Sequence, residues 1–302
     1  MKKFLVPLLL AISVPVLAQD STRVPFFKPE AIGFYSGITA FRDVPVTISD
    51  LQKIAPSSAL LGADLDSFKT NTFTGSGNVN SVFGMGVDFR YRMRSNGQYA
   101  GFSRIRASIM YTNGQTAYRE FYRNSTVRTD TVRLSNGQQF YVDSIHNEYY
   151  TYSWNYQALG IDLNQVFHTK DARIFSAYTG YGIHFGLIIG SYFSATHELQ
   201  TGSQFLTTDS TATGSSMGYF TTNTRQDETE NIATKNYYTF SFYVPVGFQV
   251  RFSKKKNFAN KLCFFIEGRG GVNMMKVPGL GTRTSPFGIY MGGFRFCFEN
   301  TQ

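Results

Sequence analysis

Residues 238–253 decide the fold, and they read Tyr-Thr-Phe-Ser-Phe-Tyr-Val-Pro-Val-Gly-Phe-Gln-Val-Arg-Phe-Ser. Every even position carries Tyr, Phe or Val, whereas the odd positions are mostly polar or small. Successive side chains of a strand point to opposite faces, so this stretch predicts a strand with one apolar and one polar face. The alternation runs much longer than the ~5–6 residues of an average strand.

The same period of two recurs along the chain, and no helical period competes with it. Each stretch reaches or exceeds the ~9–11 residues that a strand needs to cross a lipid bilayer. A change of parity within 149–167 indicates a bulge near Gln157 or Ala158. We therefore predict an all-β fold with eight strands, at 31–42, 79–94, 99–123, 147–168, 173–195, 234–253, 261–275 and 284–298.

The composition supports this prediction. Charged residues make up 16% of the 302 residues, below the ~25% of an average soluble domain. Aromatic residues also reach 16%, so the chain has apolar surface to bury and intrinsic disorder is excluded. The two cysteines are too few for a scaffold held by disulfides.

The first residues have the pattern of an export signal. Lys2 and Lys3 precede an apolar run at 4–17, and Val16-Leu17-Ala18 provides small residues before a cleavage site. The run is shorter than the ~20 residues of a membrane-spanning helix. We expect a cleaved signal peptide at 1–18, followed by a periplasmic segment at 19–30.

The polar faces of the strands distinguish two architectures. A soluble sandwich also shows alternation, but here arginines stand opposite long aromatic faces on strand after strand. In lipid such a sheet must close, because its backbone groups find no water to pair with. We predict a closed, antiparallel, up-and-down transmembrane β-barrel of eight strands at 31–298, with the apolar face outward.

Short and long connections alternate between the predicted strands. The short ones are 95–98, 169–172 and 254–260, and three of the others are long, at 43–78, 124–146 and 196–233. Outer-membrane barrels have tight periplasmic turns and longer extracellular loops. Ser135-Asn136-Gly137 predicts a hairpin that extends the third and fourth strands as a ribbon. Residues 43–78 carry enough leucines for an amphipathic helix or a packed lid, and 196–233 has the composition of a solvated, mobile loop.

Aromatic residues gather toward the strand ends, as in the two interfacial girdles of such barrels. Those predicted at the extracellular rim are Tyr149, Tyr150, Tyr152, Trp154, Tyr192, Phe193, Tyr237 and Tyr238. Those predicted at the periplasmic rim are Phe167, Phe175, Phe252, Phe264, Phe296 and Phe298.

The opening strand Gly33-Phe34-Tyr35-Ser36-Gly37 and the end Tyr290-Met291-Gly292-Gly293-Phe294-Arg295-Phe296-Cys297-Phe298 carry a family resemblance. With the paired-strand rhythm, they resemble the eight-stranded outer-membrane β-barrel domain family, OmpA/OmpX-like in shape and of the Bacteroidota type. The resemblance implies location in the outer membrane of a Gram-negative bacterium and insertion by the barrel assembly machinery. It also implies contact with outer-membrane lipid and lipopolysaccharide. Residues 299–302 after the last aromatic depart from the family's terminal pattern.

The inward face is predicted to be charged. Eight strands enclose an interior that side chains can fill, and buried charges must be paired, which predicts a salt-bridged plug with excess positive charge. A narrow anion channel through the basic lumen is the alternative. The predicted lumen charge network comprises Asp88, Arg90, Arg92, Arg104, Arg106, Arg251, Glu267, Arg269 and Arg295, and the same face carries Asp162 and His184.

Cys263 and Cys297 lie on the last two predicted strands, both on the inward face. If the final hairpin turns around Leu280, the two residues are directly opposed, close enough for a disulfide after modest adjustment. Because the periplasm is oxidising, a cross-strand disulfide is one hypothesis, and two inert buried thiols are the other.

Motifs for catalysis, cofactors and metals are lacking in the sequence. The four histidines have no metal-ligand spacing, and there is no nucleophile elbow or phosphate loop. A hydrolase using His197 and Glu198, with Ser191 and Ser194, or with His184, is the enzyme alternative. The basic residues favour anionic lipid headgroups over nucleic acid as neighbours. We predict a non-enzymatic envelope protein whose loops bind an extracellular or envelope partner.

Overall fold

The computed structural model describes residues 26–41, 46–70, 78–92, 100–133, 135, 139–169, 174–206, 219–252 and 261–298. Within these ranges the first strands are β1 (Phe27–Phe41), β2 (Lys69–Thr70), β3 (Asn78–Tyr91), β4 (Ser103–Arg133) and β5 (Gln139–His168). They are followed by β6 (Phe175–Leu206), β7 (Tyr219–Ala233), β8 (Tyr238–Arg251), β9 (Leu262–Val277) and β10 (Gly281–Cys297). Helix α2 spans Ile48–Ile54, and the 3-10 helix η1 spans Leu60–Gly62.

Several predicted features lie outside the described residues. They are the signal peptide at 1–18, the segment 19–25, the turns at 95–98 and 254–260, and all but the first residue of the turn at 169–172.

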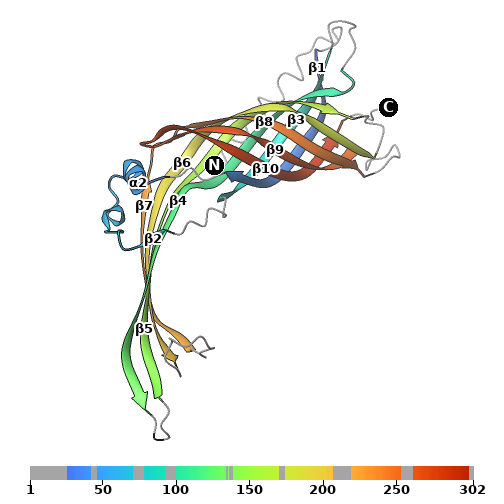
Figure 1. Cartoon of the computed structure of the whole chain (residues 1–302). Coiled ribbons are helices and arrows are strands. Elements are labelled where there is room, and N and C mark those ends of the chain that lie inside the picture. Colours follow the sequence, from blue (N-terminus) through green and yellow to red (C-terminus); the bar gives the residue numbers. More distant parts are fainter. Residues whose placement is uncertain are drawn as a thin grey trace, which may run out of the picture.

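Eight strands pair in a ring, and every pairing is antiparallel (Figure 1). The order is β1, β3, β4, β5, β6, β8, β9, β10 and back to β1. The return pairing holds from Ala31↔Cys297 to Phe41↔Phe287. The predicted all-β antiparallel architecture is confirmed.

The described residues form ten strands, because two segments that were predicted as loops also form strands. β2 lies within 43–78, and β7 lies within 196–233, where β6 also continues to Leu206. β7 is rich in threonine, which favours extended backbone, and it pairs with β6 from Tyr192↔Ala233 to Phe205↔Tyr219. β1 begins at Phe27, inside the predicted leading segment 19–30.

The ring is apolar outside and polar inside. On β8, Phe248 is 64% exposed, whereas the neighbouring Gln249 is buried. Glu267 and Arg269 on β9 are 1% and 3% exposed. Ile266, which precedes Glu267 on the same strand and points the other way, is 59% exposed. Large exposed apolar side chains on the other ring strands include Phe34, Ile38, Phe83, Leu159, Ile161, Leu163, Phe185, Leu187, Tyr290 and Phe294. Neither helix of the described chain is long and apolar enough to cross a membrane.

β4, β5 and β6 continue beyond one end of the ring, where β7 joins them in a four-stranded sheet (Figure 1). We call this sheet the ribbon and define it as residues 119–133, 139–152, 195–206 and 219–233. β4 and β5 stay paired up to Arg133↔Gln139, as the hairpin signal at 135–137 predicts. The segment 124–146 is therefore strand rather than loop over most of its length.

Residues 46–70 form a lid at the base of the ribbon, as their leucine content predicts. Thr47 and Asp50 form a capping box that starts α2, each side chain accepting a hydrogen bond from the other's backbone N–H. Leu51 and Ile54 pack with Leu60, Leu61 and Leu65 against the inner face of β5 and β6. Arg119 Nε donates to Val46 O over 2.8 Å, and Ser58 Oγ donates to Glu230 over 2.6 Å, which fixes the lid to β4 and β7.

A bulge lies where β5 and β6 change register, between Gln157 and Ala158 as predicted, but the extra residue is Ile189 of β6. The even positions of β5 from Tyr150 to His168 are therefore all buried, on both sides of the bulge. Tyr152, Trp154 and Phe193 are fully buried in the cluster under the lid. The prediction that these three aromatics form an exposed rim is wrong, because the lid covers the face that they share.

Candidate functional site

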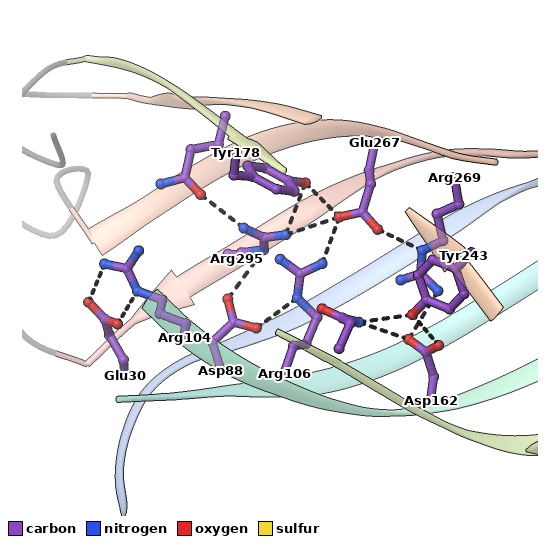
Figure 2. A network of polar contacts seen from close by, with 12 residues as sticks. Glu30, Asp88, Arg104, Arg106, Asp162, Tyr178, Tyr243, Glu267, Arg269 and Arg295 are labelled. Atoms are coloured by element: carbon purple, nitrogen blue, oxygen red, sulfur yellow. Dashed lines mark hydrogen bonds and ion pairs between the residues drawn. The ribbon is translucent and has the colours of Figure 1, made fainter. Parts of the chain in front are cut away.

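Glu267 is the centre of a polar network inside the ring (Figure 2). Its Oε2 accepts from Arg106 Nη1 of β4 over 2.6 Å and from the Tyr178 hydroxyl of β6 over 2.7 Å. Its Oε1 accepts from Arg269 Nε, two positions along β9, over 2.7 Å. One carboxylate thus connects three strands across the interior.

Asp88 of β3 and Arg295 of β10 extend the network toward the end of the ring where β1 begins. Arg106 Nε donates to Asp88 Oδ1 over 2.8 Å. Arg295 lies 3.8 Å from both Asp88 Oδ2 and Glu267 Oε2, and it donates to Gln249 over 2.9 Å. Its guanidinium also stacks 4.1 Å from the centre of the Phe265 ring.

Asp162 of β5 closes the other end of the network. Arg269 Nη1 donates to Asp162 Oδ2 over 3.0 Å, and the Tyr243 hydroxyl donates to Oδ1 over 2.5 Å. Asn164 bonds both Asp162 and Tyr243. In this central part three arginines face three carboxylates, so the charge is balanced here, and the predicted excess of arginines falls on the residues outside it.

Glu30 of β1 anchors a second group, and sequence reasoning missed it. Its carboxylate accepts from Arg104 at both oxygens and from Arg90 Nη2 over 2.6 Å. Strict alternation would point Glu30 outward with Ile32 and Phe34. The register of β1 against β3 shifts between Pro29 and Ala31, and this bulge turns Glu30 inward.

Two of the remaining predicted lumen residues lie at the same end as Glu30, and His184 lies nearer the lid. Arg92 is half-buried at the end of β3, and Arg251 is half-buried at the end of β8. Arg251 lines a small cavity together with His168, Gln249 and Cys297. His184 lines another cavity nearer the lid.

Side chains fill the interior of the ring. The cavity below the lid has a volume of about 20 Å³, the one beside His168 about 20 Å³, and the one between Tyr35 and Arg295 about 10 Å³. Each is about the size of a single water molecule. These three voids between described residues are too small for a hydrated ion, so this part of the interior is plugged by side chains.

Cys263 and Cys297 are both free thiols, with their sulfur atoms 3.9 Å apart. The directly opposed residue of Cys263 is Arg295, so the predicted direct opposition of the two cysteines is wrong by two residues. The difference arises because the final hairpin turns at Pro278–Leu280, with Gly281 paired to Val277. The cysteines are diagonal neighbours on β9 and β10.

The residues named for a hydrolase are not brought together. Six residues of extended strand, roughly 20 Å, separate Ser191 from His197. The Ser191 hydroxyl bonds Thr234, and His197 bonds Glu148 over 2.9 Å. Glu198 and Ser194 occupy the opposite parity of β6 from His197. Among the described residues, no group of three or more His, Cys, Asp or Glu side chains is arranged to hold a metal ion.

A charged cluster lies on the ribbon just beyond the lid. Arg123 Nη2 donates to Glu148 over 2.6 Å, and His197 stacks on Tyr150 with ring centres 4.3 Å apart. Burial alone would raise the pKa of Glu148, but the hydrogen bonds from Arg123 and His197 lower it below the ordinary value. Burial, assisted by the Glu148 charge, raises the pKa of Tyr150.

An open groove of about 410 Å³ runs beside this cluster. Its walls come from three ribbon strands, with Arg123 and Ser125 on β4, His146 and Glu148 on β5, and Leu199 on β6. Arg123 also donates to Ser67 over 3.0 Å and lies 4.5 Å from the Phe68 ring, which connects the groove to the lid.

Comparison with known proteins yields only weak structural likenesses. No family model matches the chain, and no curated protein matches it. The attachment invasion locus protein Ail of Yersinia pestis, solved with the heparin analogue sucrose octasulfate, is 10% identical with a TM-score of 0.25, covering 89% of this chain and 100% of Ail. A second structure of Ail is 11% identical with the same TM-score, covering 90% and 100%. A mutant of the monoaromatic hydrocarbon channel TodX is 8% identical with a TM-score of 0.16, covering 91% of each chain. With values this low, neither fold nor function is transferred from these proteins to this chain.

Proposed function

We propose that the ring is an eight-stranded transmembrane β-barrel in the outer membrane of a Gram-negative bacterium, OmpA/OmpX-like in shape and of the Bacteroidota type. The proposal rests on the distribution of side chains in the ring, which is the reverse of that in a water-soluble protein: the outside is apolar and the inside is charged. Large apolar side chains such as Phe248 and Tyr290 are more than 60% exposed outside, while Arg269 and Glu267 are buried inside. A hydrocarbon environment stabilises such an exterior, whereas water does not.

Ring closure supports the same proposal. Because β1 pairs with β10, the eight ring strands have no free edge within the ring. Their backbone N–H and C=O groups are hydrogen-bonded to neighbouring strands, as they must be in lipid, which offers no hydrogen-bonding partners. The exterior would contact outer-membrane lipid and lipopolysaccharide, and the barrel assembly machinery would insert the chain.

The two ends of the ring support one orientation. β3, β5 and β8 end, and β4, β6 and β9 begin, at the end of the ring where β1 starts, and the sequence between each pair is short. The lid and the ribbon lie at the other end. Short turns belong to the periplasmic side of such barrels and long segments to the extracellular side, so the ribbon would project from the cell.

We infer a non-enzymatic role in which a plugged barrel holds the ribbon at the cell surface for an extracellular or envelope partner. The packing of the described interior supports this role over a channel, because the three cavities described there are of single-water size. The rigid, paired ribbon with its open groove provides the accessible surface.

Purification of the mature chain tests the proposal. We expect a folded chain in detergent, aggregation in plain buffer, and no single-channel conductance after reconstitution in liposomes. A folded monomer that stays soluble without detergent would contradict the membrane barrel. Stable conductance steps would contradict the plug while leaving the barrel in place.

A further inference from the structure

The ribbon has two open edges among the described residues. β4 pairs with β3 at Ile105–Asn113 and with β2 at Phe121 and Tyr122, but beyond Tyr122 that side of the strand has no described partner. β7 pairs with β6 alone. All side chains of 123–133 and of 224–229 are exposed. Each edge therefore presents unpaired backbone N–H and C=O groups that another strand can join.

The two edges carry opposite charge. The β4 edge has Arg123, Arg128 and Arg133 against Asp130. The β7 edge has Asp227, Glu228 and Glu230 against Arg225. Like charges placed opposite each other destabilise a strand pair, and opposite charges stabilise it. Counted along the two edge strands themselves, the net charges disfavour a pair of like edges and favour a pair of unlike ones, although Arg123 and Arg128 also pair with Glu148 and Asp143 of their own ribbon.

We propose that copies of this chain in one membrane join edge to edge, with β7 of one ribbon pairing with β4 of the next. The inference rests on the proposed membrane orientation. β4 runs from the ring toward the ribbon tip, and β7 runs back toward the ring. Because all copies in a membrane point the same way, β7 beside a neighbour's β4 is antiparallel. β4 beside β4, or β7 beside β7, would be parallel.

Topology and charge therefore select the same pairing. The β7–β4 pairing continues the antiparallel order of the ribbon strands from one copy to the next. One copy contributes its β7 edge and the other its β4 edge. Such a head-to-tail contact leaves a free β4 edge and a free β7 edge on every pair, so association continues into a row or closes into a ring of copies.

Cross-linking on intact cells tests this inference. Thr126→Cys marks the β4 edge and Gln226→Cys marks the β7 edge, in a chain whose Cys263 and Cys297 are replaced by serine. We expect a ladder of dimers, trimers and larger products when one chain carries both new cysteines. Co-expressed chains that carry one cysteine each should yield dimers only, and either single variant alone should remain monomeric.

The opposite results are equally specific. Dimers from Thr126→Cys alone or from Gln226→Cys alone would overturn the head-to-tail arrangement, and products with a different protein would overturn self-association. An impermeant maleimide on the same cells reports separately on membrane orientation. Labelled thiols without cross-links overturn this inference but leave the proposed function intact, whereas thiols that are neither cross-linked nor labelled contradict the proposed orientation itself.

Charge exchange provides the matched control. Arg128→Glu with Arg133→Glu should abolish the ladder, and adding Asp227→Arg with Glu228→Arg should restore it. A ladder that survives the first pair of substitutions, or fails to return with the second, contradicts recognition by charge. Raising the ionic strength should also weaken cross-linking, because exposed charges are screened by salt.

Discussion

Arg106 Nη1 lies 2.6 Å from Glu267 Oε2, although the two residues are 161 positions apart in the chain. They sit on β4 and β9, which are not neighbours in the ring. This ion pair therefore crosses the interior and ties opposite walls together. Both side chains are almost completely buried, at 5% and 0% exposure, so neither charge has water as an alternative partner.

Replacing Glu267 with glutamine should strongly destabilise the ring. The substitution keeps the size of the side chain but leaves Arg106 and Arg269 buried without their shared carboxylate. Removing one partner of a buried pair lowers the free energy of unfolding by about 3–5 kcal/mol. Urea unfolding in detergent or lipid measures the loss. The exposed Glu228→Gln on β7 is the matched control and should unfold like the wild type. Equal stability of both variants would mean that the network does not support the ring.

Gly279→Ala should detach the lid, whereas Gly281→Ala should not. Both glycines have positive φ, at 69° and 75°, so alanine costs about 1–2 kcal/mol at either position. Only at Gly279 would the new Cβ meet the lid, 2.3 Å from Lys53 O; nothing lies within 4 Å at Gly281. Limited trypsin digestion after Lys53 reports lid opening. Equal digestion of the two variants would show that this turn does not hold the lid.

The cluster on the ribbon should loosen in acid. The pKa of Glu148 lies below its ordinary value of 4.5, so its contribution to stability is complete above that pH and is lost as the pH falls further. The protection factors against hydrogen exchange around Arg123 and His197, which are corrected for the intrinsic pH dependence of exchange, should therefore fall below about pH 4.5 and stay constant between there and neutrality. Glu148→Gln should exchange fast at every pH. A wild-type protein with no acid-dependent change would contradict the role given to this carboxylate.

Cys263 and Cys297 should form a bridge when an oxidant is supplied. Their sulfur atoms are 3.9 Å apart, and the pair lies at the end of the ring proposed to face the oxidising periplasm. Mass spectrometry of protein treated with a disulfide-containing oxidant should show the loss of two hydrogens and a peptide linking β9 to β10. Cys263→Ser should show neither. Two free thiols after treatment would support the inert-thiol hypothesis instead.

Strand alternation was enough to predict the faces of the sheet. The period of two in 238–253 assigns Phe248 outward and Gln249 inward, and the structure has them so. The alternation reports only parity, however. It could not locate the bulge at Glu30, which turns an outward position inward, or the extra residue Ile189 on β6.

The pairing of strands far apart in the chain could not be predicted from the sequence either. Nothing in the composition of 196–233 distinguishes a solvated loop from an edge strand, because threonine and charged residues suit both. Pairing with β6 decides between them. Likewise, Tyr152 and Trp154 have the pattern of rim aromatics, and only the docking of the lid over their face buries them.

Fluorescence quenching by lipids brominated in their acyl chains tests most directly whether the apolar exterior faces hydrocarbon. Trp154 is the only tryptophan of the chain, and it is fully buried under the lid. In reconstituted liposomes we expect its emission to be unaffected by the brominated lipid. Phe248→Trp in a Trp154→Phe background should lose most of its emission, because position 248 points outward from β8. An unquenched tryptophan at 248 in the folded, reconstituted protein would contradict the membrane barrel.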